Sequence, residues 1–251
     1  MVVRDLIPIS TSDQIKLYID RAMLINYYTT YPEQRGSDKF KKRKLQKLRE
    51  QIPEDVVEIP EKFVFIPLQV HDDTQVLLNC RHFNSVESFF EAAYPAIKRN
   101  FGSDFKIVVK EHPEDLGRWD YTEFRKKFPD VIWLRKYNVE KLLDKASCVV
   151  LINSSVGLQA IKRMKPTVVF GESFYSKPEV SFYVRDLAVV DDVMKAAASG
   201  ITPAMQANIE FFLGYLSSVF FLPGAWKNVT EACQRFAAHR VMQLAGGGHH
   251  V

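Results

Sequence analysis

Four short polar clusters hold most of the side chains in this sequence that could do chemistry. The clusters read HDDTQ from His71, EHPED from Glu111, NSS from Asn153 and GESFYS from Gly171. Each cluster comes directly after an apolar run of strand length. Carboxylates can act as nucleophiles or bases, and hydroxyls together with an imidazole can bind a phosphate. Four such clusters in the same position relative to a strand are a stronger signal than any one of them.

Two adjacent aspartates follow the first apolar run. Asp72 and Asp73 would point to opposite sides of an extended segment, so at most one of them is expected to face a shared site. A carboxylate in that place could act as a nucleophile, a general base or a metal ligand. The alternative is a structural role, in which an aspartate caps a turn or a helix.

The second cluster contains a histidine that could act near neutral pH. The proline after His112 restricts the histidine backbone to extended geometry and would hold the imidazole at the strand end. There it could donate a hydrogen bond to a phosphate or exchange a proton, or it could only bind a loop carbonyl. Alternation places Lys110 on the same side as His112. Glu114 and Asp115 could bind a ribose hydroxyl or cap a following helix.

The third cluster is a hydroxyl-rich turn between a strand and a helix. Ser154 and Ser155 follow the apolar run 148–152, and helical spacing then continues until Pro166. Backbone N–H groups, two hydroxyls and the positive end of the helix dipole suit a phosphate. The plain alternative is that one of the two serines only caps the helix.

The order of the elements predicts the fold class. Strands are expected over residues 63–70, 105–110, 131–134, 148–152 and 167–170, and helices over 85–100, 121–128, 139–146 and from 156 to before Pro166. This alternation is typical of an α/β fold with a doubly wound, Rossmann-like parallel sheet. Ligands bind beyond the carboxyl ends of the strands in such sheets, and the four polar clusters lie there.

The remaining chain is predicted to be mostly helical. Residues 1–58 are interpreted as a helical appendage and linker, residues 59–245 as the Rossmann-like domain with C-terminal helices, and residues 246–251 as a disordered tail. A short strand near 182–185 and helices over 191–198, 203–221 and 226–244 are expected. The basic stretch 39–50 is interpreted as a solvated helix face, with contact to an anionic membrane surface or an acidic polymer as the alternative.

Composition and motifs narrow the class of function. The chain of 251 residues is 47% hydrophobic and 25% charged, which is ordinary for a globular protein. A net charge of +4 is too small to indicate a nucleic-acid partner. The three cysteines have neither disulfide nor metal spacing, and the N-terminus lacks a signal-peptide pattern, so a cytoplasmic location is expected. No glycine-rich dinucleotide fingerprint or P-loop follows any predicted strand, which argues against NAD and ATP chemistry of the usual kinds.

The segments FVFIPLQVHDDTQV, VKEHPED and NSSVGLQAIKRMKPTVVFGESFYS, in this order, resemble the capsule polysaccharide biosynthesis/export family. That family includes the bacterial transferases that attach Kdo (3-deoxy-D-manno-octulosonic acid) to the lipid linker of capsules. The resemblance covers residues 60–185. The His-Pro and Ser-Ser pairs are also similar to motifs of bacterial sialyltransferases, which likewise use CMP-activated acidic sugars.

The resemblance implies a glycosyltransferase with a GT-B architecture, of which this domain looks like one lobe. It implies transfer of an acidic sugar, with Kdo expected, from a CMP-activated donor to a glycolipid or glycan acceptor. The CMP-sugar is the donor substrate, and neither a further cofactor nor a metal is expected. Peripheral contact with the inner face of the inner membrane, or with a partner subunit, is compatible with such an acceptor.

The resemblance also implies roles for single residues. Asp73 matches the family aspartate that serves as nucleophile or essential carboxylate of a retaining transfer, and Asp72 is the fallback. His112 matches the His-Pro motif, with a role at the CMP phosphate or in proton transfer. Ser154 and Ser155 match the serine pair that binds the donor phosphate.

Further residues are expected to lie around the donor. Asn153 precedes the serine pair and Lys110 lies beside the His-Pro motif, and both are expected to contribute to donor binding. Glu172, Phe174 and Tyr175 lie in the matching Gly-x-x-Phe-Tyr segment near the nucleotide. Gln69 and Gln75 belong to the first motif, and the sequence gives them no role.

One feature departs from the family pattern. Its members usually have two Rossmann-like lobes with the site between them, whereas residues 1–58 are too short for a second lobe. The chain is therefore expected to be a piece of a two-lobe enzyme or to take its acceptor lobe from a partner. A non-catalytic sugar-nucleotide-binding or assembly module of a polysaccharide export system stays open as the alternative function. A different phosphate-binding α/β enzyme, such as an epimerase, fits the fold but matches the motifs less well.

Overall fold

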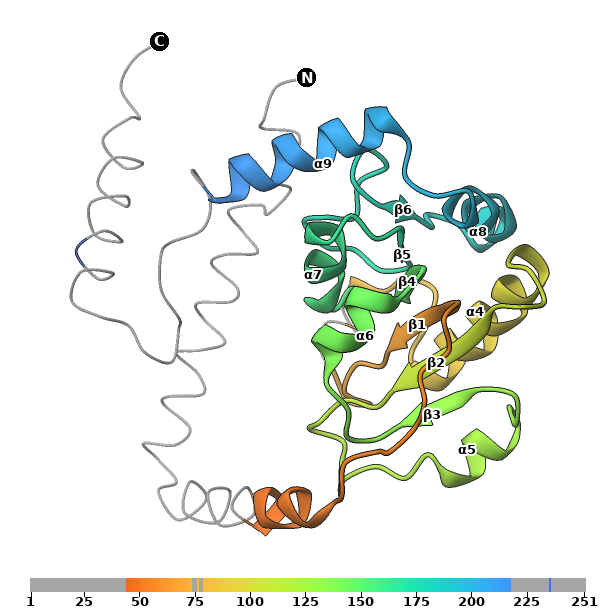
Figure 1. The fold of residues 1–251 in the computed structure, drawn as a ribbon. Helices are drawn as coiled ribbons and strands as arrows, with labels where there is room; N and C mark the ends of the chain where they lie inside the picture. The colour runs from red at the N-terminus through yellow and green to blue at the C-terminus, as the bar shows by residue number, and fades with distance from the viewer. Residues whose placement is uncertain (1–43, 74–75, 77–78, 218–234, 236–251) are drawn as a thin grey trace.

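A six-stranded, fully parallel β-sheet forms the centre of the protein (Figure 1). The computed structural model describes residues 44–73, 76, 79–217 and 235. The strand order is β3-β2-β1-β4-β5-β6. The strands are β1 (Phe63–Pro67), β2 (Lys106–Lys110), β3 (Ile132–Leu134), β4 (Cys148–Leu151), β5 (Thr167–Val169) and β6 (Phe182–Tyr183).

Helices follow the strands in the order that the sequence predicts. They are α4 (Val86–Asn100), α5 (Thr122–Lys126), α6 (Val139–Lys145), α7 (Val156–Lys162), α8 (Val190–Ala198) and α9 (Pro203–Tyr215), and a 3-10 turn, η2 (Leu187–Val189), precedes α8. The predicted Rossmann-like parallel sheet is therefore confirmed. The helix predicted over 226–244 and most of the predicted appendage fall outside the described residues.

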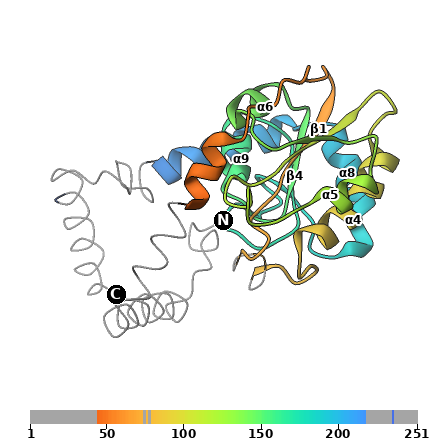
Figure 2. The same ribbon diagram turned by 90° about the horizontal axis from the view of Figure 1, so that it is seen from below.

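The sheet is buried on both faces, which explains why its strands are continuous apolar runs. Alternate residues of β1 belong to two different cores: Val64 and Ile66 pack on one face, and Phe63 and Phe65 on the other. Helices α4 and α8 cover the first face, and α6, α7 and α9 cover the second (Figures 1 and 2). Local hydrogen bonds set the ends of the helices. Ser85, for example, is the N-cap of α4 and forms a capping box.

The segment before β1 is attached to the loops at the carboxyl edge of the sheet. The Asp55 carboxylate accepts the backbone N–H groups of Arg135 and Lys136, which follow β3, at 2.6 and 2.7 Å. Residues 44–51 are helical, and Arg49 from this helix donates to the Glu114 carbonyl at 2.6 Å. The end of the basic stretch therefore contacts the loop after β2 as well as solvent. The predicted division into appendage and domain stays a prediction.

The strand order creates a crevice at one place along the carboxyl edge. The chain builds β2 and β3 on one side of β1 and then returns to place β4 on the other side. The loops after β1 and β4 therefore leave the sheet in opposite directions, which is the usual ligand position in doubly wound folds.

Candidate functional site

Gln69 joins the two loops that meet at this crevice. Its side chain is 4% exposed, and its amide nitrogen donates to Asn153 Oδ1 at 2.9 Å and to Asp73 Oδ2 at 3.1 Å. Its amide oxygen accepts the backbone N–H of Asn153 at 3.0 Å. Gln69 therefore fixes the aspartate that follows β1 against the turn that follows β4. The sequence indicated no role for this residue, although it lies within the first motif.

The two adjacent aspartates have different surroundings. Half-buried Asp73 accepts from Gln69, whereas exposed Asp72 pairs with Arg118 at 2.5 Å. Desolvation works to raise the pKa of Asp72, but the hydrogen bond and the charge of Arg118 outweigh it and leave that pKa below its ordinary value. The geometry therefore separates the aspartates in the way that alternation predicts, with Asp73 at the crevice.

A buried aspartate holds the loop after β1 to the loop after β2. Asp115 is 0% exposed and accepts from the backbone N–H of His71 at 3.0 Å and from its Nδ1 at 2.7 Å. The hydroxyl of Tyr121 donates to the same carboxylate at 3.0 Å. The His71 ring also stacks on Trp119, with centroids 4.4 Å apart. Asp115 thus holds the loops after β1 and β2 together. Sequence reasoning missed this contact, although Asp115 and His71 both lie in the polar clusters.

His112 lies at the end of β2, in the loop that Asp115 anchors. Its Nδ1 accepts the backbone N–H of Glu114 at 3.1 Å, so the proton of the neutral ring is on Nε2. Burial lowers the pKa of His112, and the positive charge of Lys110 lowers it further. The negative charges of Asp115 and Asp73 act to raise this pKa but do not outweigh burial. The neutral imidazole can therefore donate one hydrogen bond through Nε2 at neutral pH.

The serine turn lies at the start of α7, a helix of two turns. Ser154 accepts the backbone N–H of Val156 through its hydroxyl at 3.3 Å, so it partly fulfils the capping role. Ser155 occupies the N-cap position but makes no side-chain cap hydrogen bond, and it is exposed. The turn therefore presents one hydroxyl at the surface beside the Gln69–Asn153 contact.

Residues of the segment after β5 contact this serine turn. Tyr175 is 1% exposed, and its hydroxyl donates to the Ser154 carbonyl. The tight fit requires Gly157, because a Cβ there would lie 2.6 Å from the Tyr175 hydroxyl. Asn153 Nδ2 donates to the Glu172 carbonyl at 3.3 Å. Tyr175 therefore supports the phosphate-type turn from within the core, while Glu172 lies at the surface.

The remaining predicted residue, Lys110, is also buried. The residue is 4% exposed, its ammonium donates to the Glu111 carbonyl at 2.8 Å, and burial lowers its pKa. Burial raises the pKa of the Glu111 carboxyl group. The ion pairs of Glu111 with Arg125 and Arg135 act against this rise. These charges hold the end of β2 in place beneath the His112 loop.

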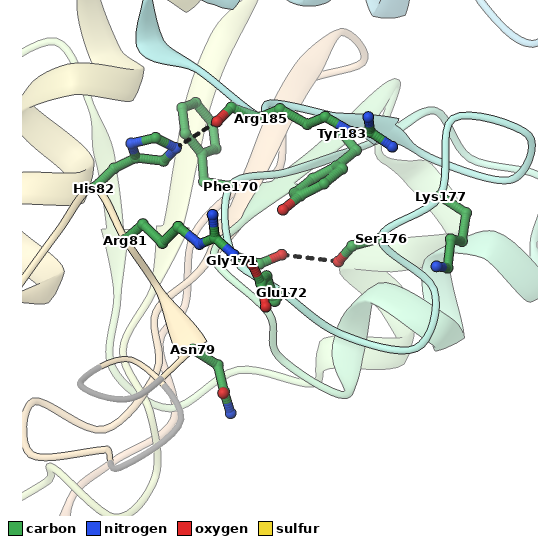
Figure 3. A pocket seen from close by; sticks show the side chains of 10 residues that line it. All are labelled: Asn79, Arg81, His82, Phe170, Gly171, Glu172, Ser176, Lys177, Tyr183 and Arg185. Atoms are coloured by element: carbon green, nitrogen blue, oxygen red, sulfur yellow. Dashed lines mark hydrogen bonds and ion pairs between the residues drawn. The ribbon is translucent and has the colours of Figure 1, made fainter. Parts of the chain in front are cut away.

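A cavity of about 330 Å³ lies one strand further along the same edge, at the ends of β5 and β6 (Figure 3). Basic residues from three segments line it: Arg81, Lys177 and Arg185. Burial raises the pKa of the Tyr183 phenol, Glu172 adds to the rise, and the two arginines oppose it. Glu172, Arg81 and Arg185 therefore act on the same phenol.

The arrangement suits an anionic ligand with a reactive carbon between its anion and a carboxylate. Hydroxyl, imidazole N–H and backbone N–H donors can bind phosphate oxygens, and the Asp73 carboxylate shares the Gln69 amide with Asn153 of the serine turn. Among the described residues, no group of three histidine, cysteine or carboxylate side chains could hold a metal ion. No helix in the described part of the chain is both long and apolar enough for a membrane span.

Comparison with known proteins places the sequence among capsule proteins. The family described as "Capsule polysaccharide biosynthesis protein" matches residues 5–187. The capsule polysaccharide modification protein LipB of Neisseria meningitidis serogroup A is 32% identical over 128 residues, which are 48% of this chain and 30% of LipB. Protein FixF of Sinorhizobium fredii is 27% identical over 170 residues, 68% of this chain and 40% of FixF. The chain thus spans well under half the length of these relatives.

The solved structures that match this chain are more distant in sequence. KpsC of Thermosulfurimonas dismutans, a β-Kdo 2,7 transferase, is 16% identical, with a TM-score of 0.42 over 68% of this chain and 60% of that one. The wall teichoic acid polymerase TagF is 14% identical, with a TM-score of 0.38 over 82% of this chain and 48% of TagF.

Proposed function

This chain belongs to the capsule polysaccharide biosynthesis family, and we propose on that premise that it is a glycosyltransferase domain. It transfers an acidic sugar, Kdo, from a CMP-activated donor to a glycolipid or glycan acceptor. One observation carries the proposal: Gln69 binds both Asp73 and Asn153 at the point where the strand order reverses. A carboxylate and an anion-binding turn are thereby held together where doubly wound folds bind ligands.

The donor phosphate is bound by neutral groups in this proposal. His112 is neutral because burial lowers its pKa, and its Nε2–H donates to a phosphate oxygen. The Ser155 hydroxyl and the backbone of the turn donate from the other side. These donors stabilise the charge that CMP gains as it leaves, so that no cofactor beyond the donor is required.

The Asp73 carboxylate acts as the nucleophile of a retaining transfer. It attacks the anomeric carbon as the bond from that carbon to the phosphate oxygen breaks, and CMP leaves with the electron pair. The acceptor hydroxyl then attacks the anomeric carbon of the resulting glycosyl ester, the bond from that carbon to the Asp73 oxygen breaks to release the carboxylate, and the proton of the hydroxyl passes to solvent water. The Gln69 amide orients the carboxylate through Oδ2 at 3.1 Å.

The test is a transfer assay with CMP-Kdo and a lipid acceptor, with CMP release measured alongside product. Asp73→Ala and His112→Ala should each lower the rate more than about a hundred-fold, the range expected for a positioned acid, base or nucleophile. Asp104→Asn is the matched control, because Asp104 is an exposed aspartate paired with Lys62. Unchanged turnover in both site variants would refute the residue roles.

A second function is sugar-nucleotide binding without transfer. It is considered because the matched region is only 30% of LipB and 40% of FixF, so a role common to the whole relatives is not shown for this region. The domain would then be a binding or assembly module of a polysaccharide export system. Tight CMP binding without product, in the same assay, identifies this function.

The proposal also includes a location. In it the domain acts in the cytoplasm, in peripheral contact with the inner face of the inner membrane or with a partner subunit. Cosedimentation with vesicles that contain the acceptor lipid tests this part of the proposal.

A further inference from the structure

A short helix before the sheet lies against the loop that follows β2. It covers residues 44–51 and is drawn in orange in Figures 1 and 2. Leu45 from this helix is within contact range of Gly117 in the loop, where an added Cβ would lie 3.8 Å from Leu45 Cδ2. Arg49 lies about one turn further along the helix, and its side chain is 20% exposed. The proposed function uses none of these residues, although the loop carries His112.

All three nitrogen atoms of the Arg49 guanidinium contact this loop. Nη2 donates to the Glu114 carbonyl at 2.6 Å, Nε donates to the Leu116 carbonyl at 3.3 Å, and Nη1 pairs with the Glu114 carboxylate at 3.0 Å. The two carbonyls fix the geometry because the guanidinium is planar, whereas an ion pair with an exposed carboxylate contributes little. In the described part of the chain, neither carbonyl accepts a backbone N–H. Arg49 therefore supplies hydrogen bonds that the turns of this loop leave open.

The residue that Arg49 holds also determines the state of the His112 ring. The Glu114 N–H donates to His112 Nδ1 at 3.1 Å, while the carbonyl of the same residue accepts from Arg49. The Asp115 N–H closes the turn by donating to the His112 carbonyl at 3.0 Å. A displacement of Glu114 would therefore break the contact that leaves the proton of the neutral imidazole on Nε2.

A second attachment keeps the helix close to the loop. The Asp55 carboxylate accepts from the backbone N–H groups of Arg135 and Lys136 after β3, and the Asp55 N–H donates to the Lys136 carbonyl at 2.9 Å. Lys136 Nζ in turn donates to the Ile52 carbonyl at 3.1 Å. The segment before β1 is thus attached to two neighbouring loops of the carboxyl edge, and Arg49 acts from a support that is itself fixed.

We propose that Arg49 is a positioning residue for His112. By holding the Glu114 and Leu116 carbonyls, it keeps the Glu114 N–H on His112 Nδ1, so that the Nε2–H of the ring stays available to an anionic ligand. The segment before β1 is then part of the frame of the site. The inference rests on the proposed function for the identity of the ligand, but the state of the imidazole is measured without any ligand.

The test measures which ring nitrogen of His112 carries the proton. Long-range ¹H–¹⁵N spectra of the full chain, labelled with ¹⁵N-histidine, are recorded at about pH 8, where the ring is neutral, and the His112→Asn variant assigns its resonances. The Nε2–H form should dominate in the wild type. Arg49→Gln should lower the ratio of the Nε2–H form to the Nδ1–H form about five-fold, the factor that one neutral hydrogen bond contributes. Arg49→Lys is the milder variant and should lower the ratio as well, since an ammonium cannot donate to both carbonyls from one plane.

Arg163→Gln is the matched control. The Arg163 side chain is 27% exposed and pairs with Glu140 and Asp144. It also donates to a backbone carbonyl at 3.1 Å, so it has a similar set of partners at the end of α7 that is far from the serine turn. This substitution should leave the His112 tautomer ratio unchanged even if it lowers stability. An unchanged ratio in both Arg49 variants, or an equal change in Arg163→Gln, would overturn the assignment.

Binding of CMP links this result to the proposed function. Arg49→Gln should weaken CMP binding about five-fold in the wild-type background but less than about two-fold in the His112→Ala background, because a positioning residue acts through the ring that it holds. Equal weakening in the two backgrounds would count against action through His112. A wild type that binds no CMP would refute the proposed function, and the tautomer ratio would still decide the role of Arg49.

Discussion

Replacing Gln69 tests whether one side chain holds the two halves of the site together. Gln69→Leu keeps the approximate volume but removes three hydrogen bonds, at 2.9, 3.0 and 3.1 Å, one of them to a carboxylate. A neutral hydrogen bond contributes about 1 kcal/mol and one to a charged group about 2 kcal/mol. The buried apolar surface of the leucine side chain recovers about 1 kcal/mol of this lost stability. The free energy of unfolding should therefore fall by about 3 kcal/mol.

Urea denaturation followed by circular dichroism measures this change. With an m-value of about 2 kcal/mol/M, the midpoint should fall by about 1.5 M while m stays constant. Gln206→Leu is the control, because exposed Gln206 makes one contact of the same type, to Glu210 at 3.0 Å, and its loss should alter stability by less than about 0.5 kcal/mol. The reasoning is refuted if both variants shift the midpoint equally.

Three further predictions concern the loops around the site. Gly157→Ala should lower the free energy of unfolding by about 2 kcal/mol, since the new methyl group would press on the Tyr175 ring, and calorimetric melting measures this; a melting temperature unchanged from wild type would contradict the packing. Asp115→Asn should destabilise by about 2 kcal/mol and change the fluorescence of Trp119, because one of the two oxygens that accept from His71 and Tyr121 becomes an NH₂ donor, and an unaltered emission spectrum would argue against that link. Burial lowers the pKa of His112 below its unfolded value of about 6.5, so the free energy of unfolding of the wild type should fall as pH drops through and below that value. In urea melts between pH 7 and 5, His112→Asn should reduce the dependence of this free energy on pH. Parallel pH profiles for the two proteins would exclude an effect of His112 burial on stability.

The fold could be predicted from the sequence because its strands are buried on both faces. Such strands are continuous apolar runs, as in β1, and their alternation with helical patterns leaves few topologies open. The ends of elements were less accurate: the run 63–70 was expected as one strand, but β1 ends at Pro67. The Leu68 N–H still donates to the Lys110 carbonyl of β2 at 2.9 Å, and a turn closed by the Asp73 N–H and the Val70 carbonyl follows.

The site was predicted in outline and not in its contacts. Position after a strand predicted that Asp73, His112 and the serine turn lie at one edge of the sheet, since the carboxyl ends of parallel strands share one edge, and the roles of these residues stay predictions. The roles of Gln69 and Asp115 depend on partners that are 84 and 44 residues away, and no local pattern carries that information. A polar residue within an apolar run, as Gln69 is, was the available signal.

Calorimetric titration with CMP and with cytidine tests the central claim most directly, because the two ligands differ only in the phosphate. The account predicts that CMP binds at least about ten-fold more tightly than cytidine, and that Ser155→Ala with His112→Ala removes most of this difference. Equal affinity for CMP and cytidine, or a difference that survives both substitutions, would contradict a phosphate site between the loops after β2 and β4.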